Sequence, residues 1–487
     1  MANKVISHLY PQPVWEIFES ICGVPRPSKH EEKIMAWTLN FAKEHDVEAF
    51  QDKAGNVILR KPATPGMEDR KGVVLQSHLN MVPQKNSDTV HDFEKDPILP
   101  RIEDGWVKAT GTTLGADNGI GMSASLAVMA AKDIVHGPIE CLITFDEETS
   151  MGGATALEGG VLQGDILINL DSEDHGEIFI GCAGGVNTTA KLKYSEETTD
   201  ASMAAYNVTV KGLKGGHSGL DIHLGRGNAN KVMNRVLWNA AKQFGLRVSQ
   251  ISGGSLRNAI PREAFALVTV PAANKAAFEK FVADFYAEVK NELASTDEGV
   301  IISAEAATLP ATIMDADSQQ KFLDAVYACP NGVFGMSADM PGLVETSNNL
   351  AIVKSEGGYI VFELLQRSSV ETQKDDIRNA VASTFAMVGA EIEHGHDYPG
   401  WKPNVNSEIL KEMVGVFKNM YGKEPKLMAV HAGLECGLLG RVYPKWDMIS
   451  FGPTIRSPHS PDERVNIESV GEFWKYLLET LKNIPKK

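Results

Sequence analysis

Three short apolar runs, each ending in acidic residues or histidine, constrain the fold of this chain more than any other feature. Residues 73–77 lead into His78, residues 139–145 into an acidic triplet that contains Glu147 and Glu148, and residues 165–170 into Asp171. Runs with helical periodicity alternate with them, and buried strands that alternate with helices form a largely parallel sheet covered on both faces. The sequence therefore predicts an α/β fold with polar residues at the carboxyl ends of its strands.

A second domain interrupts this α/β pattern. At 487 residues the chain is too long for one hydrophobic core. Residues 206–304 have the order β-α-β-β-α-β, and residues 318–391 look like a looser copy of it. The α/β pattern returns after residue 396, so we expect a discontinuous domain of residues 1–187 and 396–487. An α+β domain of residues 188–395, built as two ferredoxin-like units, would be inserted into it.

Two helix starts can be placed from local signals. Ser28 and Glu31 have the spacing of a capping box, which predicts that a helix begins at that point. Residues 118–131 are small and apolar, and they predict a buried helix that begins directly after Asp117.

Charge and composition exclude several classes of partner. A formal net charge of −16 argues against nucleic acid and anionic membranes, because both bind basic surfaces. No apolar run is long enough for a signal peptide or a membrane span, so we expect a cytoplasmic protein. The five cysteines are scattered, without C-x-x-C spacing, and fit reduced thiols. A metal site in this chain would therefore use histidine and carboxylate ligands.

Six polar residues could form such a site. Four of them follow predicted strands and two follow loops in comparable positions: His78, Glu147, Glu148, Asp171, Asp117 and His459. In open parallel sheets ligands bind beyond the carboxyl ends of the strands. Two histidines with three of these four carboxylates suit Zn²⁺ or Mn²⁺, and five ligands suit two metals that share one carboxylate. Taken singly, each residue more often caps a loop or lies at the surface.

The adjacent acids that follow residues 139–145 can have different roles. Paired acids are usually only solvated, but successive side chains after a strand point in different directions. One of Glu147 and Glu148 could therefore bind a metal while the other transfers protons.

Several motifs of the chain resemble those of a known family. The motifs are Ser-His78-Leu-Asn80-Met-Val-Pro, Gly115-Ala-Asp117-Asn-Gly-Ile-Gly, Glu147-Glu148, Asp171-Ser-Glu, Gly215-Gly-His217-Ser-Gly, Arg257-Asn258-Ala-Ile-Pro-Arg, His431-Ala-Gly-Leu-Glu-Cys-Gly and Pro458-His459-Ser-Pro-Asp. They are similar to those of the bacterial Xaa-His (aminoacyl-histidine) dipeptidases, co-catalytic zinc peptidases related to carboxypeptidase G and peptidase T. The similarity extends over essentially the whole chain.

The resemblance implies a dinuclear zinc centre, in which Mn²⁺ or Co²⁺ could replace Zn²⁺. It implies that Asp117 bridges the two ions, that His78 and Asp171 hold one, and that Glu148 and His459 hold the other. Glu147 would be the general base that deprotonates a water bridging the ions, and the hydroxide would attack the peptide carbonyl.

The resemblance also assigns residues of the inserted domain, which it identifies as a lid over the catalytic domain. His217 would donate a hydrogen bond to the oxyanion, and Asn258 and Arg367 would hold the substrate. Without the resemblance, a histidine in a glycine-rich turn and an arginine at a strand end fit structural roles equally well. Relatives with smaller lids pair through them, but a duplicated lid could supply His217 within one chain, so a homodimer stays open. His175, His223 and His431 are expected at the surface or behind the site.

Asn80 departs from the family pattern His-x-Asp. The aspartate orients the zinc-bound imidazole, and an asparagine could do so only through its neutral amide oxygen. We expect an enzyme weakened by about 10- to 100-fold. Restoring aspartate should then raise turnover or zinc affinity.

These observations predict a dinuclear zinc dipeptidase that hydrolyses unblocked dipeptides, preferentially Xaa-His dipeptides such as β-alanyl-histidine. Two alternatives remain. One is an N-acyl amino acid or tripeptide hydrolase of the same family. The other is a metal or peptide binder whose catalysis was weakened through Asn80, although the intact Glu147 argues against it.

Overall fold

The chain folds into two compact units in a computed structural model that describes residues 5–487. The first unit contains the chain up to Gly181 together with Pro403–Ala429 and Leu434–Lys487, and the second contains Cys182–Lys402 and Val430–Gly433. The two main boundaries lie after Gly181 and after Lys402, whereas the sequence suggested boundaries after residues 187 and 395. Residues 430–433 belong to the second unit, which the sequence did not suggest. Residues 1–4, the start of the expected first domain, lie outside the described residues.

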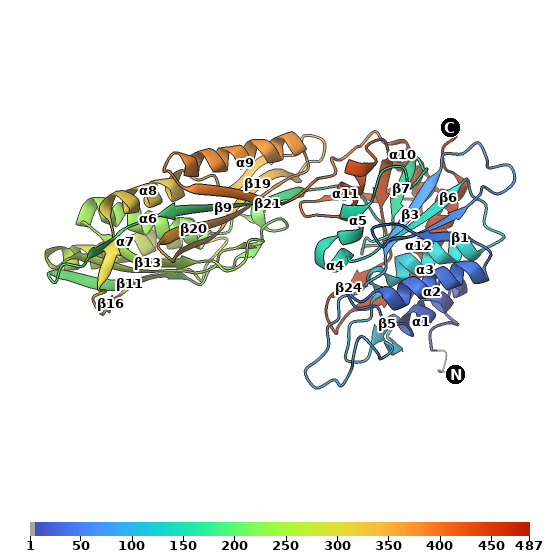
Figure 1. The fold of residues 1–487 in the computed structure, drawn as a ribbon, viewed down its shortest axis with the longest axis horizontal. Helices are drawn as coiled ribbons and strands as arrows, with labels where there is room; N and C mark the ends of the chain where they lie inside the picture. The colour runs from blue at the N-terminus through green and yellow to red at the C-terminus, as the bar shows by residue number, and fades with distance from the viewer. Residues whose placement is uncertain (1–4) are drawn as a thin grey trace. The chain divides into compact units, whose positions relative to one another are not determined.

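An eight-stranded sheet forms the centre of the first unit (Figure 1). Its strands in spatial order are β1 (Glu48–Gln51), β2 (Val57–Lys61), β6 (Ile139–Thr144), β3 (Val73–His78), β7 (Ile166–Asn169), β23 (Asp447–Ser450), β8 (Glu177–Cys182) and β22 (Lys426–Val430). The four middle strands, from β6 to β23, are parallel, as the sequence predicts. The pairings β1 with β2, β2 with β6 and β23 with β8 are antiparallel.

Helices cover this sheet on both sides. Figure 1 shows α5 (Gly152–Ala156) and α11 (Glu435–Val442) on one side, and α1 (Gln12–Cys22), α2 (Glu32–Glu44) and α3 (Ala116–Ala130) on the other. Helices α10 (Glu408–Tyr421) and α12 (Ile467–Lys482) pack against each other. Every residue of β3, β6 and β7 is buried, which is why these segments are continuously apolar in sequence. A small sheet adds β4 (Pro100–Glu103), β5 (Trp106–Ala109), β24 (Ile455–Arg456) and β25 (Arg464–Asn466).

The capping-box prediction at Ser28 and Glu31 was wrong. Helix α2 begins at Glu32, and its cap makes no side-chain hydrogen bond. Ser28 Oγ instead donates to Met81 O at 3.1 Å, and a Glu31 carboxylate oxygen accepts the Asp146 N–H at 3.2 Å. Both side chains form hydrogen bonds with backbone groups of the loops that follow β3 and β6. A capping-box pattern considers only the start of a helix, so it does not predict these hydrogen bonds.

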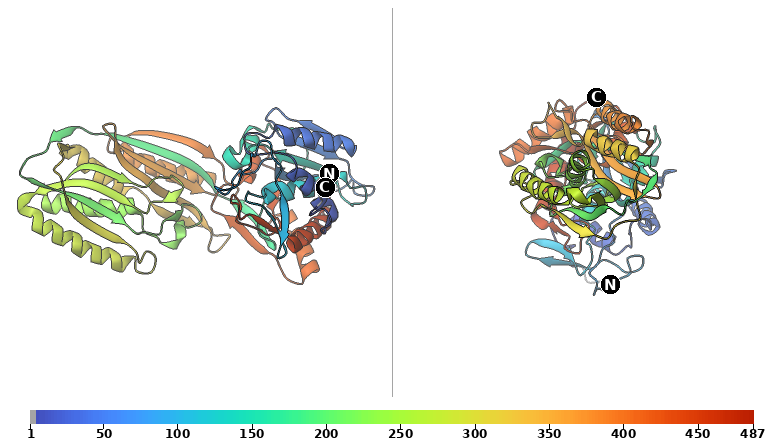
Figure 2. Two further views of the ribbon diagram at one scale, coloured as in Figure 1. Left: turned by 90° about the horizontal axis from the view of Figure 1, so that it is seen from below. Right: turned by 90° about the vertical axis from the view of Figure 1, so that its left-hand side faces the viewer.

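The second unit is built on a nine-stranded antiparallel sheet. Eight of its strands are, in spatial order, β16 (Ile301–Ala307), β11 (Met203–Lys211), β15 (Ala264–Pro271), β13 (Arg247–Gly253), β19 (Val344–Glu356), β20 (Tyr359–Ser368), β9 (Gly184–Lys193) and β21 (Glu391–Tyr398). The ninth, β18 (Gly332–Met336), pairs with β19. Helices α6 (Ala229–Phe244), α7 (Lys275–Glu292), α8 (Ala316–Ala328) and α9 (Glu371–Ala386) form one layer against it (Figure 2). Tyr206, Val208 and Val210 alternate with more exposed residues because only one face of the sheet carries helices.

This sheet contains the same β-α-β-β-α-β unit twice. The first copy is β11-α6-β13-β15-α7-β16 and the second is β9-α8-β19-β20-α9-β21, and in both copies the first strand lies between the third and the fourth. The copies join through β13 and β19, their second strands. Strand β9 precedes the whole first copy in sequence, so the first copy is inserted after the first strand of the second. That is why the sequence alone showed only an incomplete second copy.

No helix of residues 5–487 combines the length and apolarity required to span a bilayer.

Candidate functional site

The six candidate residues of the first unit come together at the carboxyl ends of the middle strands. His78 is the last residue of β3 and is 1% exposed. Its Nε2 lies 3.2 Å from Asp117 Oδ1, 3.5 Å from Asp171 Oδ1 and 3.9 Å from Glu147 Oε2. Its other ring nitrogen, Nδ1, lies 3.1 Å from the backbone oxygen of Asn80, which fixes the ring plane.

Asp117 lies between two histidines. One of its carboxylate oxygens faces His78, and the other, Oδ2, lies 3.2 Å from His459 Nε2. His459 Nε2 is also 2.9 Å from Glu148 Oε2. The His459 side chain is 51% exposed, so this end of the cluster is open to solvent while the His78 end is closed.

Glu147 and Glu148 begin the four-residue helix α4 (Glu147–Ser150), which directly follows β6 and Asp146. Their carboxylates reach different histidines, Glu147 toward His78 and Glu148 toward His459. Asp146 turns the chain with a left-handed φ of 53°, and its carboxylate is held by Lys29, Thr149 and Ser150. Non-glycine residues adopt this conformation rarely, and strained backbone of this kind clusters at functional sites.

The cluster buries more carboxylates than its imidazoles can neutralise. Burial raises the pKa of Asp171 to about 6 and that of Glu147 well above its usual range, where the Asp171 and Glu435 carboxylates raise it further. Although burial opposes it, Asp171 and Asp117 raise the pKa of His78. Hydrogen bonds to Asp117 and Glu148 raise that of His459 to about 11. Such mutual shifts are typical of catalytic and metal sites.

The residues present fit a metal. His78, Asp117 and Glu148 each offer a ligand atom, and these atoms lie within 4.8 Å of one another. Glu148 Oε1 is buried without a hydrogen-bond partner among the described residues, as expected of an oxygen reserved for a cation. Asp171 and His459 flank this group, so hard oxygen and borderline nitrogen donors surround one space.

The expected role of the Asn80 side chain was wrong. It does not contact the His78 ring, which is held by the Asn80 backbone oxygen instead. The amide oxygen of Asn80 accepts the Glu147 N–H at 3.2 Å, and its Nδ2 donates to Ser28 Oγ at 3.0 Å. The backbone donor fixes the orientation of the amide, so Asn80 holds the start of α4 rather than an imidazole.

Asn80→Asp should therefore act through its charge alone. A carboxylate can still accept the Glu147 N–H, and the Ser28 hydroxyl can turn toward it because Met81 O also accepts the Ser28 N–H. We expect unchanged turnover at saturating metal, up to about tenfold tighter metal binding, and a lower unfolding temperature of the metal-free protein. Metal titration and thermal unfolding test this, with the exposed Asn86→Asp as a charge control. If Asn80→Asp raises turnover at saturating metal, the side chain at position 80 does orient the His78 ring.

Three further candidates gather in the second unit. His217 lies in β12 (Gly216–His217), paired with β14 (Ala259–Ile260), and Ser218 N–H donates to Asn258 O at 2.8 Å. The backbone N–H groups of Gly219 and Leu220 donate to His217 Nδ1 at 3.2 and 3.1 Å. Burial and then Arg367 lower the pKa of His217, so its ring is neutral and carries its proton on Nε2. His217 therefore presents a hydrogen-bond donor.

Arg367, at the end of β20, is buried rather than solvated. It is 5% exposed, and Nη1 donates to the Tyr398 hydroxyl at 2.9 Å. Among residues 5–487 no carboxylate forms an ion pair with it, which leaves a buried cation suited to a carboxylate ligand. The exposed Asn258 side chain likewise makes no hydrogen bond within the described residues. His431 is buried, and its Nε2 lies 2.7 Å from Ser347 Oγ.

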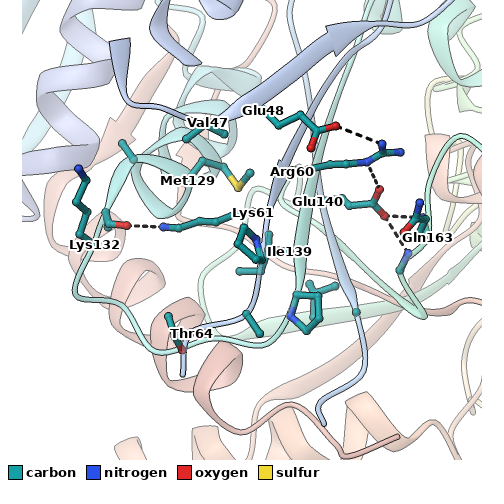
Figure 3. A pocket seen from close by; sticks show the side chains of 18 of the residues that line it. Val47, Glu48, Arg60, Lys61, Thr64, Met129, Lys132, Ile139, Glu140 and Gln163 are labelled. Carbon is teal, nitrogen blue, oxygen red and sulfur yellow. Dashed lines mark hydrogen bonds and ion pairs between the residues drawn. The ribbon is translucent and has the colours of Figure 1, made fainter. Parts of the chain in front are cut away.

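A cavity lies at the opposite end of the first unit's sheet. It has a volume of about 930 Å³ and is lined by Val73 and Ile139, the first residues of β3 and β6. Figure 3 shows Arg60 between Glu48 and Glu140: Arg60 contacts Glu140 at 3.0 Å, and a Glu140 oxygen accepts the Gln163 N–H. None of the candidate site residues lines this cavity.

Sequence reasoning missed three buried charged residues beside the site. Arg26, Glu435 and Glu463 are each 2% exposed. Glu435 Oε2 accepts hydrogen bonds from Gln76 Nε2 at 2.7 Å and Thr144 Oγ1 at 2.8 Å. In the sequence, Arg26 is marked only by the prolines on both sides of it. Glu435 and Glu463 are marked only by the histidine motifs that they follow.

Comparison with known proteins identifies the family. The model of peptidase family M20/M25/M40 matches residues 74–483. The chain belongs to this family. It is 48% identical over 483 residues to the cytosol non-specific dipeptidase of Escherichia coli K12, a match that covers 99% of both chains.

Solved structures of peptidases agree with this assignment. The aminoacylhistidine dipeptidase from Vibrio alginolyticus has a TM-score of 0.96 and 47% identity, covering 99% of this chain and 98% of that one. A tripeptidase from Staphylococcus aureus has a TM-score of 0.55 at 16% identity, covers 98% of this chain and 99% of that one, and shows the shared fold alone.

Metal uptake by this M20/M25/M40 peptidase should release protons. The raised pKa values of His78 and His459 mean that both rings are protonated in the metal-free protein at neutral pH, whereas metal ligands must be neutral imidazoles. Affinity should therefore fall as the pH is lowered from about 8 to about 6. Calorimetric titrations in buffers with different ionisation enthalpies measure the released protons. Heats that are independent of the buffer, with constant affinity, would contradict this prediction.

Proposed function

We propose that this chain is a dinuclear metal-dependent dipeptidase that hydrolyses unblocked dipeptides, Xaa-His dipeptides among them. The observation that carries the proposal is the arrangement around Asp117. Its two oxygens face two different histidines, and each histidine has a further carboxylate beside it, Asp171 with His78 and Glu148 with His459. This is the arrangement expected of one carboxylate shared by two metal ions.

Glu147 is the proposed general base. Its carboxylate lies 3.9 Å from His78 Nε2, beyond hydrogen-bond distance, and Asn80 holds its backbone. Bound metal ions would lower the pKa of a water molecule and polarise the peptide carbonyl. Glu147 takes the proton of the attacking water and returns it to the leaving amine. Its burial supports this role, because a raised pKa brings the carboxylate closer to the operating pH.

The second unit supplies the proposed substrate-binding residues. His217 presents its Nε2–H as a donor to the developing oxyanion. Arg367, without a carboxylate partner among the described residues, binds the free carboxylate of the dipeptide. Asn258 offers an amide that makes no hydrogen bond within residues 5–487.

The finer assignments belong to the same proposal. Two Zn²⁺ are the proposed ions, with Mn²⁺ or Co²⁺ as substitutes, because histidine and carboxylate ligands suit all three. The cytoplasm is the proposed location, in line with the name of the E. coli relative. We assign a homodimer no role in the chemistry, because one chain carries both copies of the duplicated unit.

A substrate panel with metal analysis tests the proposal. The panel contains β-alanyl-histidine, dipeptides without histidine, a tripeptide and an N-acetyl amino acid, each with Zn²⁺, Mn²⁺ or Co²⁺. We expect cleavage of unblocked dipeptides by a protein that holds two ions per chain. The names of the two similar proteins differ in specificity, so the ratio of kcat/KM for histidine and other dipeptides decides the preference. Cleavage of only the tripeptide or the N-acetyl compound, or peptide binding without cleavage, would overturn the proposal.

A further inference from the structure

Two buried charged side chains connect the loops that carry the metal-site residues of the first unit. Arg26 lies between α1 and α2, and Glu463 lies just before β25. Each is 2% exposed, and neither contributes an atom to the cluster around Asp117. Burying a guanidinium or a carboxylate is costly unless its hydrogen bonds are satisfied. Both side chains satisfy theirs on backbone groups of the site's loops.

Arg26 binds two of these loops at once. Its Nη1 donates to Leu79 O at 3.1 Å and to Asn80 O at 2.8 Å, and its Nη2 donates to Gly115 O. Asn80 O is also the atom that contacts His78 Nδ1. The guanidinium therefore fixes the carbonyl that orients the His78 ring, and it connects this carbonyl to the turn before Asp117.

Glu463 binds the same turn from the other side. Its Oε2 accepts the N–H groups of Leu114 and Gly115 at 2.7 and 2.8 Å, and its Oε1 accepts the Asp117 N–H at 3.2 Å. Glu463 lies four residues after His459 in the same loop. This carboxylate therefore connects the loop of His459 to the backbone of Asp117.

The glycines of this turn leave room for the guanidinium. A Cβ on Gly115 would lie 2.5 Å from Arg26 Nη2, and one on Gly119 would lie 2.7 Å from the same atom. Gly115 also has a left-handed φ of 72°, which side chains rarely adopt. The glycine-rich motif around Asp117 therefore accommodates Arg26.

We propose that Arg26 and Glu463 are positioning residues that set the spacing between His78, Asp117 and His459 and so allow two metal ions to bind. The proposal rests on the dinuclear metal site proposed above. A buried pair that served stability alone could bind any segment of the chain. Among residues 5–487, the side-chain hydrogen bonds of Arg26 and Glu463 go to the loops that carry His78 and Asp117, and Glu463 itself lies in the loop of His459.

Arg26→Lys and Glu463→Gln test the proposal in the full chain. Lysine keeps the positive charge, but it lacks the planar guanidinium whose two NH₂ groups bind the loops of His78 and Asp117 at once. Glutamine keeps the shape, but its NH₂ would face either the Asp117 N–H or those of Leu114 and Gly115. We expect each variant to bind Co²⁺ about 10- to 100-fold more weakly and to change the visible absorption spectrum of bound Co²⁺. At saturating metal kcat should fall more than KM changes.

A matched pair at the other end of the sheet is the control. Arg60 Nη2 donates to Val161 O, and Glu140 accepts the N–H groups of Gln163 and Gly164, so this pair also binds backbone (Figure 3). Arg60→Lys and Glu140→Gln should lower the unfolding temperature while leaving Co²⁺ affinity and its spectrum unchanged.

The outcomes separate the two proposals. Wild-type protein that binds no Co²⁺ would overturn the metal site itself and this inference with it. If the wild type binds Co²⁺, and folded Glu463→Gln protein binds it with the same affinity and spectrum, the positioning role is excluded. If Arg26→Lys fails to fold, Glu463→Gln alone tests the proposal, because glutamine has the same shape as glutamate.

Discussion

Glu147→Gln should lower kcat by roughly two to four orders of magnitude while the protein keeps its fold and its metal. Glutamine has the same shape, and the Asn80 side chain still accepts the backbone N–H of residue 147. The change removes the proton acceptor and one negative charge, and it keeps the shape of the side chain. The measurements are steady-state kinetics on a dipeptide and metal content by elemental analysis.

The neighbouring residue provides the control. Glu148→Gln makes the same chemical change one residue further along α4, but Glu148 lies 2.9 Å from His459 and has a buried oxygen without a partner among the described residues. It should lose metal and activity together, and added metal should restore part of the activity. If Glu147→Gln loses metal instead, Glu147 is a ligand, and if it keeps its turnover, it is not the base.

Asp117→Asn should lower the metal content from two ions per chain to one or fewer, and kcat/KM by roughly three orders of magnitude, equivalent to about 4 kcal/mol. The amide carries no charge and would turn an NH₂ group toward either His78 or His459, which now face the two oxygens of Asp117. Metal titration and kinetics over a range of metal concentrations measure both effects.

Asp165→Asn is the matched control for this change. Asp165 precedes β7 at the end opposite to Asp171, and its carboxylate accepts the Gly72 N–H at 3.0 Å. This variant should alter stability without altering the metal content. An Asp117→Asn protein that binds two ions with wild-type affinity would exclude a shared carboxylate.

Much of the fold could be predicted from the sequence because burial leaves a direct pattern. The continuous apolar runs before His78 and Glu147 predicted parallel strands, and β3 and β6 are fully buried. The alternation of Tyr206, Val208 and Val210 indicated a strand, and these residues lie in β11. The duplication was visible only in part, because the whole first copy lies in sequence between β9 and the rest of the second copy.

Less of the candidate site than of the fold could be predicted from the sequence. The residues with reactive side chains could be selected, because residue type and position after a strand are local properties. Their partners could not be predicted. Asn80 reads as a weakened partner of His78, yet its amide holds the Glu147 backbone. Ser28 and Glu31 read as a helix cap, yet they bind the backbone of loops beside the site.

The sequence by itself determined the α/β class and the residue types that can hold a metal. Hydrophobic periodicity and strand-end polarity depend on neighbours along the chain, so they can be read without a structure. Only the tertiary structure decided which carboxylate faces which histidine, and that Arg26 and Glu463 join the loops between them. Those contacts join residues up to 349 positions apart, and their geometry is set when the strands pack side by side.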